Sequence, residues 1–243
     1  MSPVSKHFCN VPKVERVIIG GSGPSLSRID YRRYPVGNIA VWRINNFFKE
    51  QKYYLGRHVD AVFNGGNRDE ISARRDVMQK LADAGIYDIN FDNFFTSIPM
   101  PNAKNHFAEI ELLDSTLHVG IWPVIAHARD TQDRHLFSGV AAIVRAILEG
   151  FREIYIAGID CDYESGPRYA YSAAKTSDAD LQWIKSYHPT DFQWDIIKQY
   201  MDKFNVKIYS LSPESPAARI FPLAPITGNT EFTLTEKTQN ENI

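Results

Sequence analysis

Residues 14–25 read VERVIIGGSGPS, and this stretch decides the fold. A run rich in β-branched residues leads directly into a glycine-rich loop, after which Leu26 and Ile29 recur at the spacing of one helix face. The order predicts a strand, a tight loop and a helix. That unit opens many domains in which strands and helices alternate.

The same alternation continues along the chain. Further strands are predicted at residues 39–44, 59–63, 154–157 and 206–211, and helices at 70–84, 137–148 and 191–204. Residues between about 67 and 134 give no secure order beyond the first of these helices. The pattern predicts one α/β domain with a mostly parallel sheet and helices on both faces. Because ligands bind outside the carboxyl ends of such strands, we expect the polar strand ends to converge on one cleft.

Composition excludes several classes of protein. The 243 residues carry 27 basic and 29 acidic side chains, a formal net charge of -2, which argues against a broad nucleic-acid-binding surface. Two cysteines, Cys9 and Cys161, make neither a disulfide framework nor a zinc motif. The low cysteine count favours a reducing cytoplasm. No apolar run approaches the roughly 18 residues of a membrane span.

The glycine-rich loop departs from a dinucleotide fingerprint. The third glycine is absent, Pro24 has no N–H group, and the strand at 39–44 ends without the acid that would hold a ribose hydroxyl. Two interpretations remain open: the loop brings backbone N–H groups to an anion, or it is a structural turn.

Residues 161–188 are predicted to form a lid, which leaves 1–160 and 189–243 as the nucleotide-binding α/β domain. From Asp160 to His188 the sequence is polar and without a sustained period. Four tyrosines gather there, Tyr163, Tyr169, Tyr171 and Tyr187. Their phenols either stabilise a departing phosphate or fasten the segment to the domain. His188 precedes Pro189 and a helix, a rigid mounting for a general base.

Asp160-Cys161-Asp162 follows a hydrophobic strand, and an Asp-x-Asp there holds a divalent ion against a diphosphate in many sugar-nucleotide transferases. Asp160 could instead accept hydrogen bonds from a ligand or cap a turn. A metal-dependent transferase of nucleotide-diphosphate sugars is therefore one alternative function. A non-catalytic nucleotide-sugar or glycan-binding protein is another.

Five blocks, in this order, carry a family resemblance: IIGGSGPSLSRIDYRRYP, VWRINNFFKEQKYYLG, FSGVAAIVRAILEGFREIYIAGID, RYAYS and KIYSLSPESPAARIFPLAP. Together they resemble the bacterial sialyltransferases of glycosyltransferase family 42, typified by the Campylobacter lipooligosaccharide enzymes. The resemblance runs from about residue 14 to 225 and is weak between about 66 and 132.

The resemblance implies a Rossmann-like domain, a variant of the GT-A fold, with a small lid. It implies an inverting transfer of sialic acid from CMP-sialic acid to a galactose-terminated glycan such as lipooligosaccharide. We expect an α-2,3 linkage, with α-2,8 activity as an addition, and neither a cofactor nor an obligatory metal.

Individual roles are carried over from matching motifs. His188 matches the family's general base, Tyr169 the second of two tyrosines that contact the departing phosphate, and Tyr163 the first. Positions expected around the donor are Gly21, Ser22, Asn45, Asn64, Arg134, Ser138, Gly139 and Asp160. Ser22 replaces a family asparagine, Asn64 is displaced by one position, and the family arginine aligns with His135, next to Arg134.

Family members assemble as homo-tetramers and associate with the inner membrane through their C-terminal region. A homo-oligomer at the cytoplasmic face of a bacterial inner membrane is therefore expected. The tail from Glu236 to Ile243 is short and polar, which weakens the expectation of membrane contact.

Overall fold

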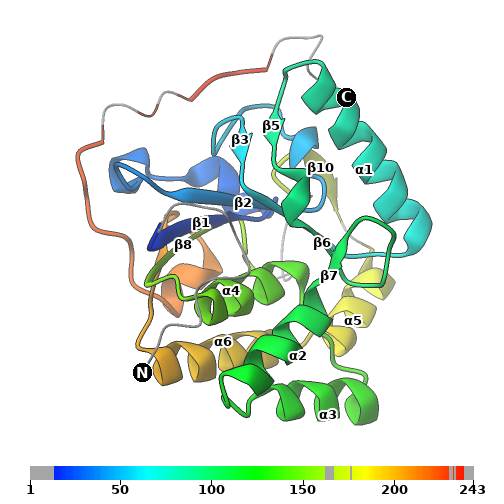
Figure 1. Ribbon diagram of the computed structural model, residues 1–243. Coiled ribbons are helices and arrows are strands. Elements are labelled where there is room, and N and C mark those ends of the chain that lie inside the picture. Colours follow the sequence, from blue (N-terminus) through cyan, green and yellow to red (C-terminus); the bar gives the residue numbers. More distant parts are fainter. Residues whose placement is uncertain (1–13, 162–166, 176, 230–231, 233, 238–243) are drawn as a thin grey trace.

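The computed structural model describes residues 14–161, 167–175, 177–229, 232 and 234–237. Its centre is a seven-stranded sheet of order β11-β8-β1-β2-β4-β6-β7, in which every neighbouring pair is parallel (Figure 1). The strands are β1 (Arg16–Gly20), β2 (Ala40–Ile44), β4 (Ala61–Asn64), β6 (Phe94–Thr96), β7 (Lys104–Asn105), β8 (Glu153–Ala157) and β11 (Lys207–Ser210). The predicted mostly parallel α/β sheet is confirmed.

The strand order reverses beside β1. The chain moves outward from β1 to β7 and then returns, so that β8 pairs with β1 on its other side. Gly20 at the end of β1 lies in register with Ala157 at the end of β8. Such a reversal opens a crevice at the carboxyl ends of the two strands, the usual ligand position in this type of sheet.

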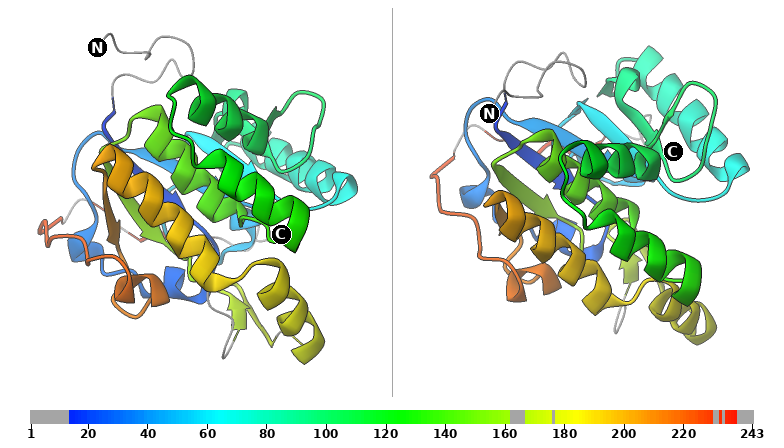
Figure 2. Two further views of the ribbon diagram at one scale, coloured as in Figure 1. Left: turned by 90° about the horizontal axis from the view of Figure 1, so that it is seen from below. Right: turned by 60° about the horizontal axis from the view of Figure 1, so that its bottom comes forward.

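Four helices gather on one side of the sheet (Figures 1 and 2). They are α2 (His106–Thr116), α3 (Trp122–Gln132), α4 (Ser138–Glu149) and α6 (Thr190–Phe204). Helix α4 is buried from Gly139 to Leu148 and packs against β1, β2 and β4. Its apolar residues exclude water from that face of the sheet and fix where its N-terminus lies.

The opposite face is covered unequally. Helix α1 (Arg68–Asp83) packs Ile71 and Met78 against Val62 of β4. Over β1 and β8, the cover consists of the 3₁₀ turns η1 (Pro24–Arg28) and η2 (Tyr31–Arg33), together with the C-terminal segment from Ala224. Helices therefore lie on both faces, as predicted.

The helix predicted after the glycine-rich loop is wrong. Leu26 and Ile29 are buried as their spacing suggested, but the chain forms η1 and η2 with extended backbone between them. The Asp30 side chain accepts a hydrogen bond from the Arg32 N–H and starts a new turn there. Local side-chain bonding of this kind competes with a continuous helix.

The segment 161–188 holds more regular structure than its sequence indicated. It contains an antiparallel hairpin of β9 (Pro167–Tyr169) and β10 (Ser172–Lys175), followed by α5 (Asp178–Tyr187). Helix α5 buries Ile184, but the helix is short, so no sustained helical period is visible in the sequence. The remaining short elements are β3 (His58–Val59), β5 (Asp88–Ile89), η3 (Phe47–Lys49), η4 (Phe91–Asn93) and η5 (Pro216–Arg219).

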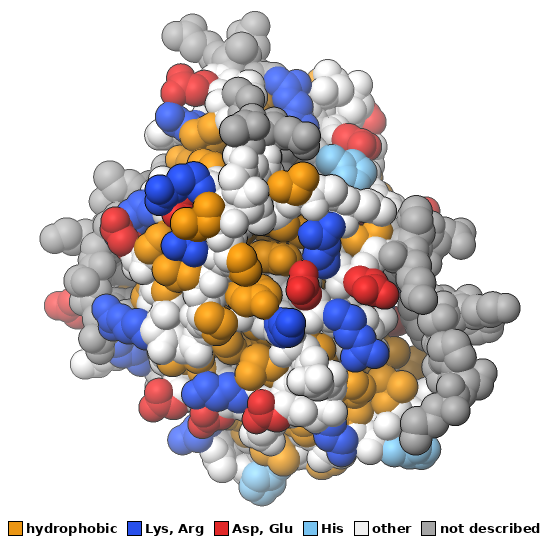
Figure 3. Space-filling view, turned by 90° about the vertical axis from the view of Figure 1, so that its left-hand side faces the viewer, with side chains coloured by type: hydrophobic (Ala, Val, Ile, Leu, Met, Phe, Trp, Pro, Cys, Tyr) orange, Lys and Arg blue, Asp and Glu red, His pale blue; other side chains and the backbone are white. Residues whose placement is uncertain are grey.

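Basic and acidic side chains are interspersed with apolar ones on the face shown in Figure 3. The described residues of that face form no continuous basic field of the kind that binds a polyanion. Within the described part of the chain, none of the helices is both long and apolar enough to cross a bilayer.

Candidate functional site

The ends of β1 and β8 meet in direct backbone contact. The Gly21 N–H donates to the Ala157 carbonyl (2.9 Å) and the Gly23 N–H to the Gly158 carbonyl (2.8 Å). Gly158 has φ +62, and a Cβ built on it would lie 2.5 Å from the Gly21 carbonyl oxygen. Because protein carbonyls already take these two N–H groups, this part of the loop serves as a packed turn rather than as an anion cradle.

Asp160 joins three loops at the carboxyl edge of the sheet. Its Oδ2 accepts the Ser25 N–H (3.0 Å), and its Oδ1 accepts the hydroxyls of Ser25 and, at 2.8 Å, of Ser215. The carboxylate is 8% exposed. These bonds hold the loops after β1, β8 and β11 together, and their donors are protein groups rather than a ligand.

The described residues do not contain a metal-binding cluster of the kind that a metal-dependent transferase would need. No group of three or more His, Cys, Asp and Glu side chains there could hold an ion. Asp162 lies outside the described residues. Cys161 is buried with φ 48, and its carbonyl accepts the Thr190 hydroxyl at 2.7 Å. That contact fastens the end of the β8 loop to the start of α6.

Asn45 and Ser138 converge on Gly65, beyond β2 and β4. Asn45 has φ 50, a conformation that asparagine tolerates, and its Oδ1 accepts the Gly65 N–H at 2.8 Å. A Cβ on Gly65 would lie 2.5 Å from the Ser138 Oγ. Ser138 and Gly139 open α4, whose N-cap residue provides no side-chain cap. Uncapped N–H groups of a helix start therefore lie beside these strand ends.

Asn64 is the last residue of β4 and is fully buried. Neither its Oδ1 nor its Nδ2 has a hydrogen-bond partner among the described residues. A buried amide in this condition costs free energy until a water molecule or a ligand group satisfies it. The carboxyl end of β4 thus presents both a donor and an acceptor.

His188 is held by its ring and by its Nδ1. The Nδ1 lies 2.7 Å from the His135 carbonyl oxygen, and the ring stacks on Phe137 with centroids 4.1 Å apart. Tyr187 packs edge-on against the same ring. A carbonyl can only accept, so Nδ1 carries the hydrogen and the neutral ring has its lone pair on Nε2. This is the tautomer a general base requires.

The segment that holds His188 is itself fixed from α6. Gln193 is fully buried, donates to the His135 carbonyl (2.8 Å) and accepts the Phe137 N–H (3.0 Å). The sequence analysis missed Gln193; its only signal is a polar residue on the buried face of an amphipathic helix. The His135 ring stacks on Tyr187 at 4.0 Å, whereas Arg134 is exposed. The structure thus brings His135, and not Arg134, to His188.

The hairpin of the predicted lid lies against the glycine-rich loop. The Ala170 N–H donates to the Ser22 carbonyl at 2.8 Å, and the rings of Tyr169 and Tyr171 stack in parallel with centroids 5.0 Å apart. Burial, and then Tyr169, raises the pKa of Tyr171 to about 12, so its phenol stays protonated near neutral pH. Tyr163 lies outside the described residues.

Ser22 directs its hydroxyl away from solvent toward a buried ion pair. Its Oγ donates to Glu50 Oε1 (3.1 Å), and the same carboxylate pairs with Arg43, both side chains being almost fully buried. Burial raises the pKa of Glu50, and the Arg43 charge opposes that rise. The sequence analysis missed this pair, although an arginine inside the apolar run 39–44 was a visible signal.

A family model described as "CST-I: Alpha-2,3-sialyltransferase (CST-I)" matches residues 15–96 and 125–243. The matched residues include the glycine-rich loop, the starts of α4 and α6, and His188. The unmatched residues, 97–124, fall within the region where the sequence resemblance is weak.

Solved structures agree over nearly the whole chain. The monofunctional alpha-2,3-sialyltransferase Cst-I of Campylobacter jejuni shares 27% identity, with 98% of this chain and 90% of that chain covered and a TM-score of 0.81. The sialyltransferase CstII of Campylobacter jejuni, solved with the substrate analogue CMP-3FNeuAc, shares 26% identity, with 92% of each chain covered and a TM-score of 0.76. CST-II solved with a trisaccharide acceptor and CMP gives 26% identity over 92% of this chain and 91% of that chain, with a TM-score of 0.74.

An uncharacterized protein of Haemophilus influenzae (strain KW20/Rd) is 31% identical over 115 residues, which cover 44% of this chain. The match spans 49% of the length of that relative.

Proposed function

Because this chain belongs to the CST-I family of alpha-2,3-sialyltransferases, we propose that it transfers sialic acid from CMP-sialic acid to the terminal galactose of a glycan, such as lipooligosaccharide, with inversion. The observation that carries the proposal is the family match on both sides of residues 97–124, since it includes every element that lines the crevice. CstII structures with CMP-3FNeuAc and with an acceptor support a nucleotide donor and a glycan acceptor.

His188 is the general base of the proposed reaction. The acceptor hydroxyl gives its proton to Nε2 as its oxygen attacks the anomeric carbon of sialic acid, and the bond from that carbon to the CMP phosphate breaks. The His135 carbonyl steadies the imidazolium that forms, because Nδ1–H is already bonded to it. One base is enough for such a direct displacement.

Tyr169, with Tyr163 as its expected counterpart, stabilises the departing phosphate. A phenol donates a hydrogen bond to the phosphate oxygen on which negative charge develops, without adding a charge of its own. The hairpin that carries Tyr169 lies against the loop at Ser22 and would also keep water away from a reactive anomeric centre.

We assign the other contacts to CMP-sialic acid from the positions of the residues at strand ends and at the start of α4. Asn45 and Ser138 converge on Gly65, Gly139 follows Ser138 in α4, and Asn64 ends β4; we assign these four residues to the donor. Gly21, Ser22 and Asp160 shape the opposite wall mainly by holding the loops together. Arg134 is exposed and therefore accessible to a donor, so its assignment to the donor is kept, and we assign the wall next to the base to His135, whose ring stacks on Tyr187.

The remaining details follow the family. We propose an α-2,3 linkage, an α-2,8 transfer as a further activity, and a reaction without cofactor or obligatory metal. The division into a nucleotide-binding domain (1–160 and 189–243) and a lid (161–188) is retained. A homo-oligomer, tetrameric as in the family, at the cytoplasmic face of a bacterial inner membrane completes the proposal.

The test is transfer from CMP-N-acetylneuraminic acid to a labelled lactoside in excess EDTA, with the linkage read by linkage-specific sialidases. Sialyl-lactoside formed in EDTA supports the proposal, and the sialidases distinguish α-2,3 from α-2,8 product. Product that appears only after a divalent metal is added would contradict it and point to the Asp160 region. CMP binding without product from lactosides or lipooligosaccharide would leave a binding protein.

A further inference from the structure

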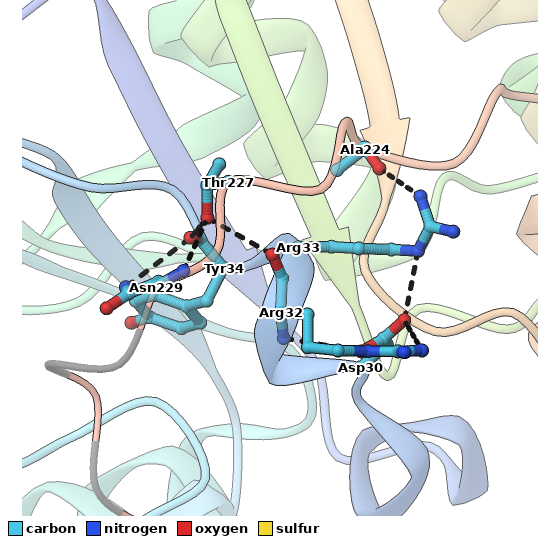
Figure 4. A network of polar contacts seen from close by, with 7 residues as sticks. All are labelled: Asp30, Arg32, Arg33, Tyr34, Ala224, Thr227 and Asn229. Carbon is cyan, nitrogen blue, oxygen red and sulfur yellow. Dashed lines mark hydrogen bonds and ion pairs between the residues drawn. The ribbon is translucent and has the colours of Figure 1, made fainter.

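The described residues of the C-terminal strap, 224–229, 232 and 234–237, lie on the face of the sheet opposite α4. Its first part is anchored to η2: Thr227 N–H donates to the Arg32 carbonyl (2.8 Å), the Thr227 hydroxyl to the Tyr34 carbonyl (2.8 Å), and Arg33 to the Ala224 carbonyl (Figure 4). Phe232 then stacks on Tyr34 at 4.3 Å. These contacts fix the strap before it reaches the segment after η3.

The end of the strap pairs with residues 51–53. The Tyr53 N–H donates to the Thr235 carbonyl (2.9 Å), and the Lys237 N–H to the Gln51 carbonyl (3.2 Å). Between them, Lys52 and Glu236 form an exposed ion pair at 2.8 Å. The backbone pairing sets the position of the Lys237 side chain.

Lys237 is buried, which is rare for a lysine. It is 7% exposed, its Nζ donates to the Phe48 carbonyl (2.6 Å), and its charge lies 5.3 Å and 5.0 Å from the ring centres of Tyr53 and Tyr87. A buried ammonium is costly unless anions, carbonyls or aromatic faces compensate it. Phe48 lies in η3, and Glu50 ends that turn with its N–H bonded to the Phe47 carbonyl, so the Lys237 bond holds the segment that places Glu50. The Lys237 charge also opposes the rise that burial causes in the pKa of Glu50.

Glu50 connects Lys237 to the active-site crevice. Its carboxylate accepts the Ser22 hydroxyl (3.1 Å), and the Ser22 carbonyl accepts the Ala170 N–H (2.8 Å) between the two stacked tyrosines. The path from strap to lid is therefore Lys237, Glu50, Ser22 and Ala170. Lys237 reaches Glu50 through its bond to Phe48 in the same turn, and the two remaining steps are hydrogen bonds. The Ser22–Glu50 contact is buried, where such interactions are strong.

We propose that Lys237 and Glu50 are positioning residues for sialyl transfer, and that they hold Ser22 and through it the Tyr169–Tyr171 segment over the donor. The inference rests on the proposed function. Without the Lys237 charge, the carboxylate of Glu50 loses part of its compensation, and the charge-assisted bond from Ser22 weakens. Tyr169 then spends less time where it meets the phosphate.

The first test compares Lys237→Met with Lys52→Met. The first change removes the buried ammonium and keeps its apolar stem, whereas the second removes the exposed ion pair of the same strap. For Lys237→Met we expect kcat to fall about tenfold, with the KM for CMP-sialic acid changed less than about threefold. Donor hydrolysis relative to transfer should rise. Lys52→Met should behave as the unchanged protein.

The second test does not need activity. Hydrogen exchange in the peptide that contains Ala170 should be faster in Lys237→Met and in Ser22→Ala than in the unchanged protein and in Lys52→Met. Ser22→Ala removes only one oxygen, so it tests the link between Glu50 and Ala170 even if Lys237→Met fails to fold. Unchanged exchange and unchanged kcat in folded Lys237→Met, or an equal effect of Lys52→Met, would overturn the proposal. An inactive unchanged protein would overturn the proposed function alone.

Discussion

His188 is fixed on three sides within the protein itself. Its Nδ1–H bond to the His135 carbonyl, the stacked Phe137 ring and the edge of Tyr187 leave the imidazole one orientation. His188→Ala removes the base, and loss of a general base costs typically 10²–10⁴-fold in rate. We expect kcat to fall by at least about 100-fold, with CMP affinity changed less than about threefold.

Calorimetric titration with CMP and steady-state transfer to lactoside measure the two quantities. His127→Ala is the matched control, because His127 is an exposed histidine on α3. A parallel loss of CMP affinity and kcat in His188→Ala would contradict the assigned role.

Tyr169 acts on the leaving group if the proposed roles hold. Tyr169→Phe deletes only the phenol oxygen and keeps the ring stacked on Tyr171 at 5.0 Å. Removing one donor to a developing charge costs about 100–1000-fold in kcat, so the variant should lose turnover with CMP affinity nearly unchanged. Calorimetric titration with CMP and steady-state transfer to lactoside measure these two effects, with Tyr209→Phe on β11 as the control. A rate within about twofold of the unchanged protein would remove Tyr169 from the mechanism.

At the scale of elements, the sequence analysis succeeds where burial and chain punctuation agree. Helix α4 was predicted at 137–148 and is found at Ser138–Glu149, because Gly150 ends it in a left-handed conformation, φ 95. The prediction of a helix after the glycine-rich loop is wrong, because the Asp30 side chain bonds locally to Arg32. Spacing shows which residues are buried, but not whether a side chain competes for the backbone.

The site shows the same division. His188 and the strand ends follow from local patterns, because they sit at junctions that the sequence itself marks. The Glu50 bond to Ser22 and the Gln193 bonds to the His135–Phe137 segment join residues 28 or more positions apart. Such contacts depend on how elements pack and leave no period in the sequence.

Gly158 tests the close approach of the loops that follow β1 and β8. Gly158→Ala combines a left-handed conformation, φ +62, with a Cβ only 2.5 Å from the Gly21 carbonyl oxygen. Gly56→Ala provides the control, because Gly56 has φ +82 and open space around it. We expect urea denaturation to show a loss of about 1 kcal/mol for Gly56→Ala and of about 3 kcal/mol or more for Gly158→Ala. Equal losses would mean that the close approach imposes no constraint.

At the scale of the whole molecule, the two faces of the sheet are covered in different ways. The helix layer of α2, α4 and α6 makes a rigid core under the sheet, while the face that carries the lid contacts is covered by short turns and the C-terminal strap. Rigid elements thus hold the strand ends, and the more adaptable cover holds Ser22 and the segment around Ala170. We therefore expect opening motions to concentrate on the face away from α4.

The rigid layer also sets how the molecule responds to acid, through His106. This residue starts α2, is fully buried between the rings of Phe63 and Phe107, and neither ring nitrogen has a hydrogen-bond partner among the described residues. Burial, and then the Arg145 charge, lowers the pKa of His106 to about 3. An unfolded histidine titrates near pH 6.5, so between these values the unfolded chain binds a proton that the folded chain does not.

The free energy of unfolding should therefore not depend on His106 above about pH 6.5 and should fall as the pH drops below that value. His106 contributes at most about 1.4 kcal/mol to this fall for each pH unit. Urea midpoints at pH 8, 6 and 5 measure the fall, and His106→Phe should flatten it while the exposed control His127→Phe does not. His58 acts in the opposite direction: burial lowers its pKa, but Asp88 and Asp60 outweigh burial and raise it, so its smaller contribution is lost as the pH rises. Identical pH dependence in His106→Phe and the unchanged protein would show that the acid response comes from other groups.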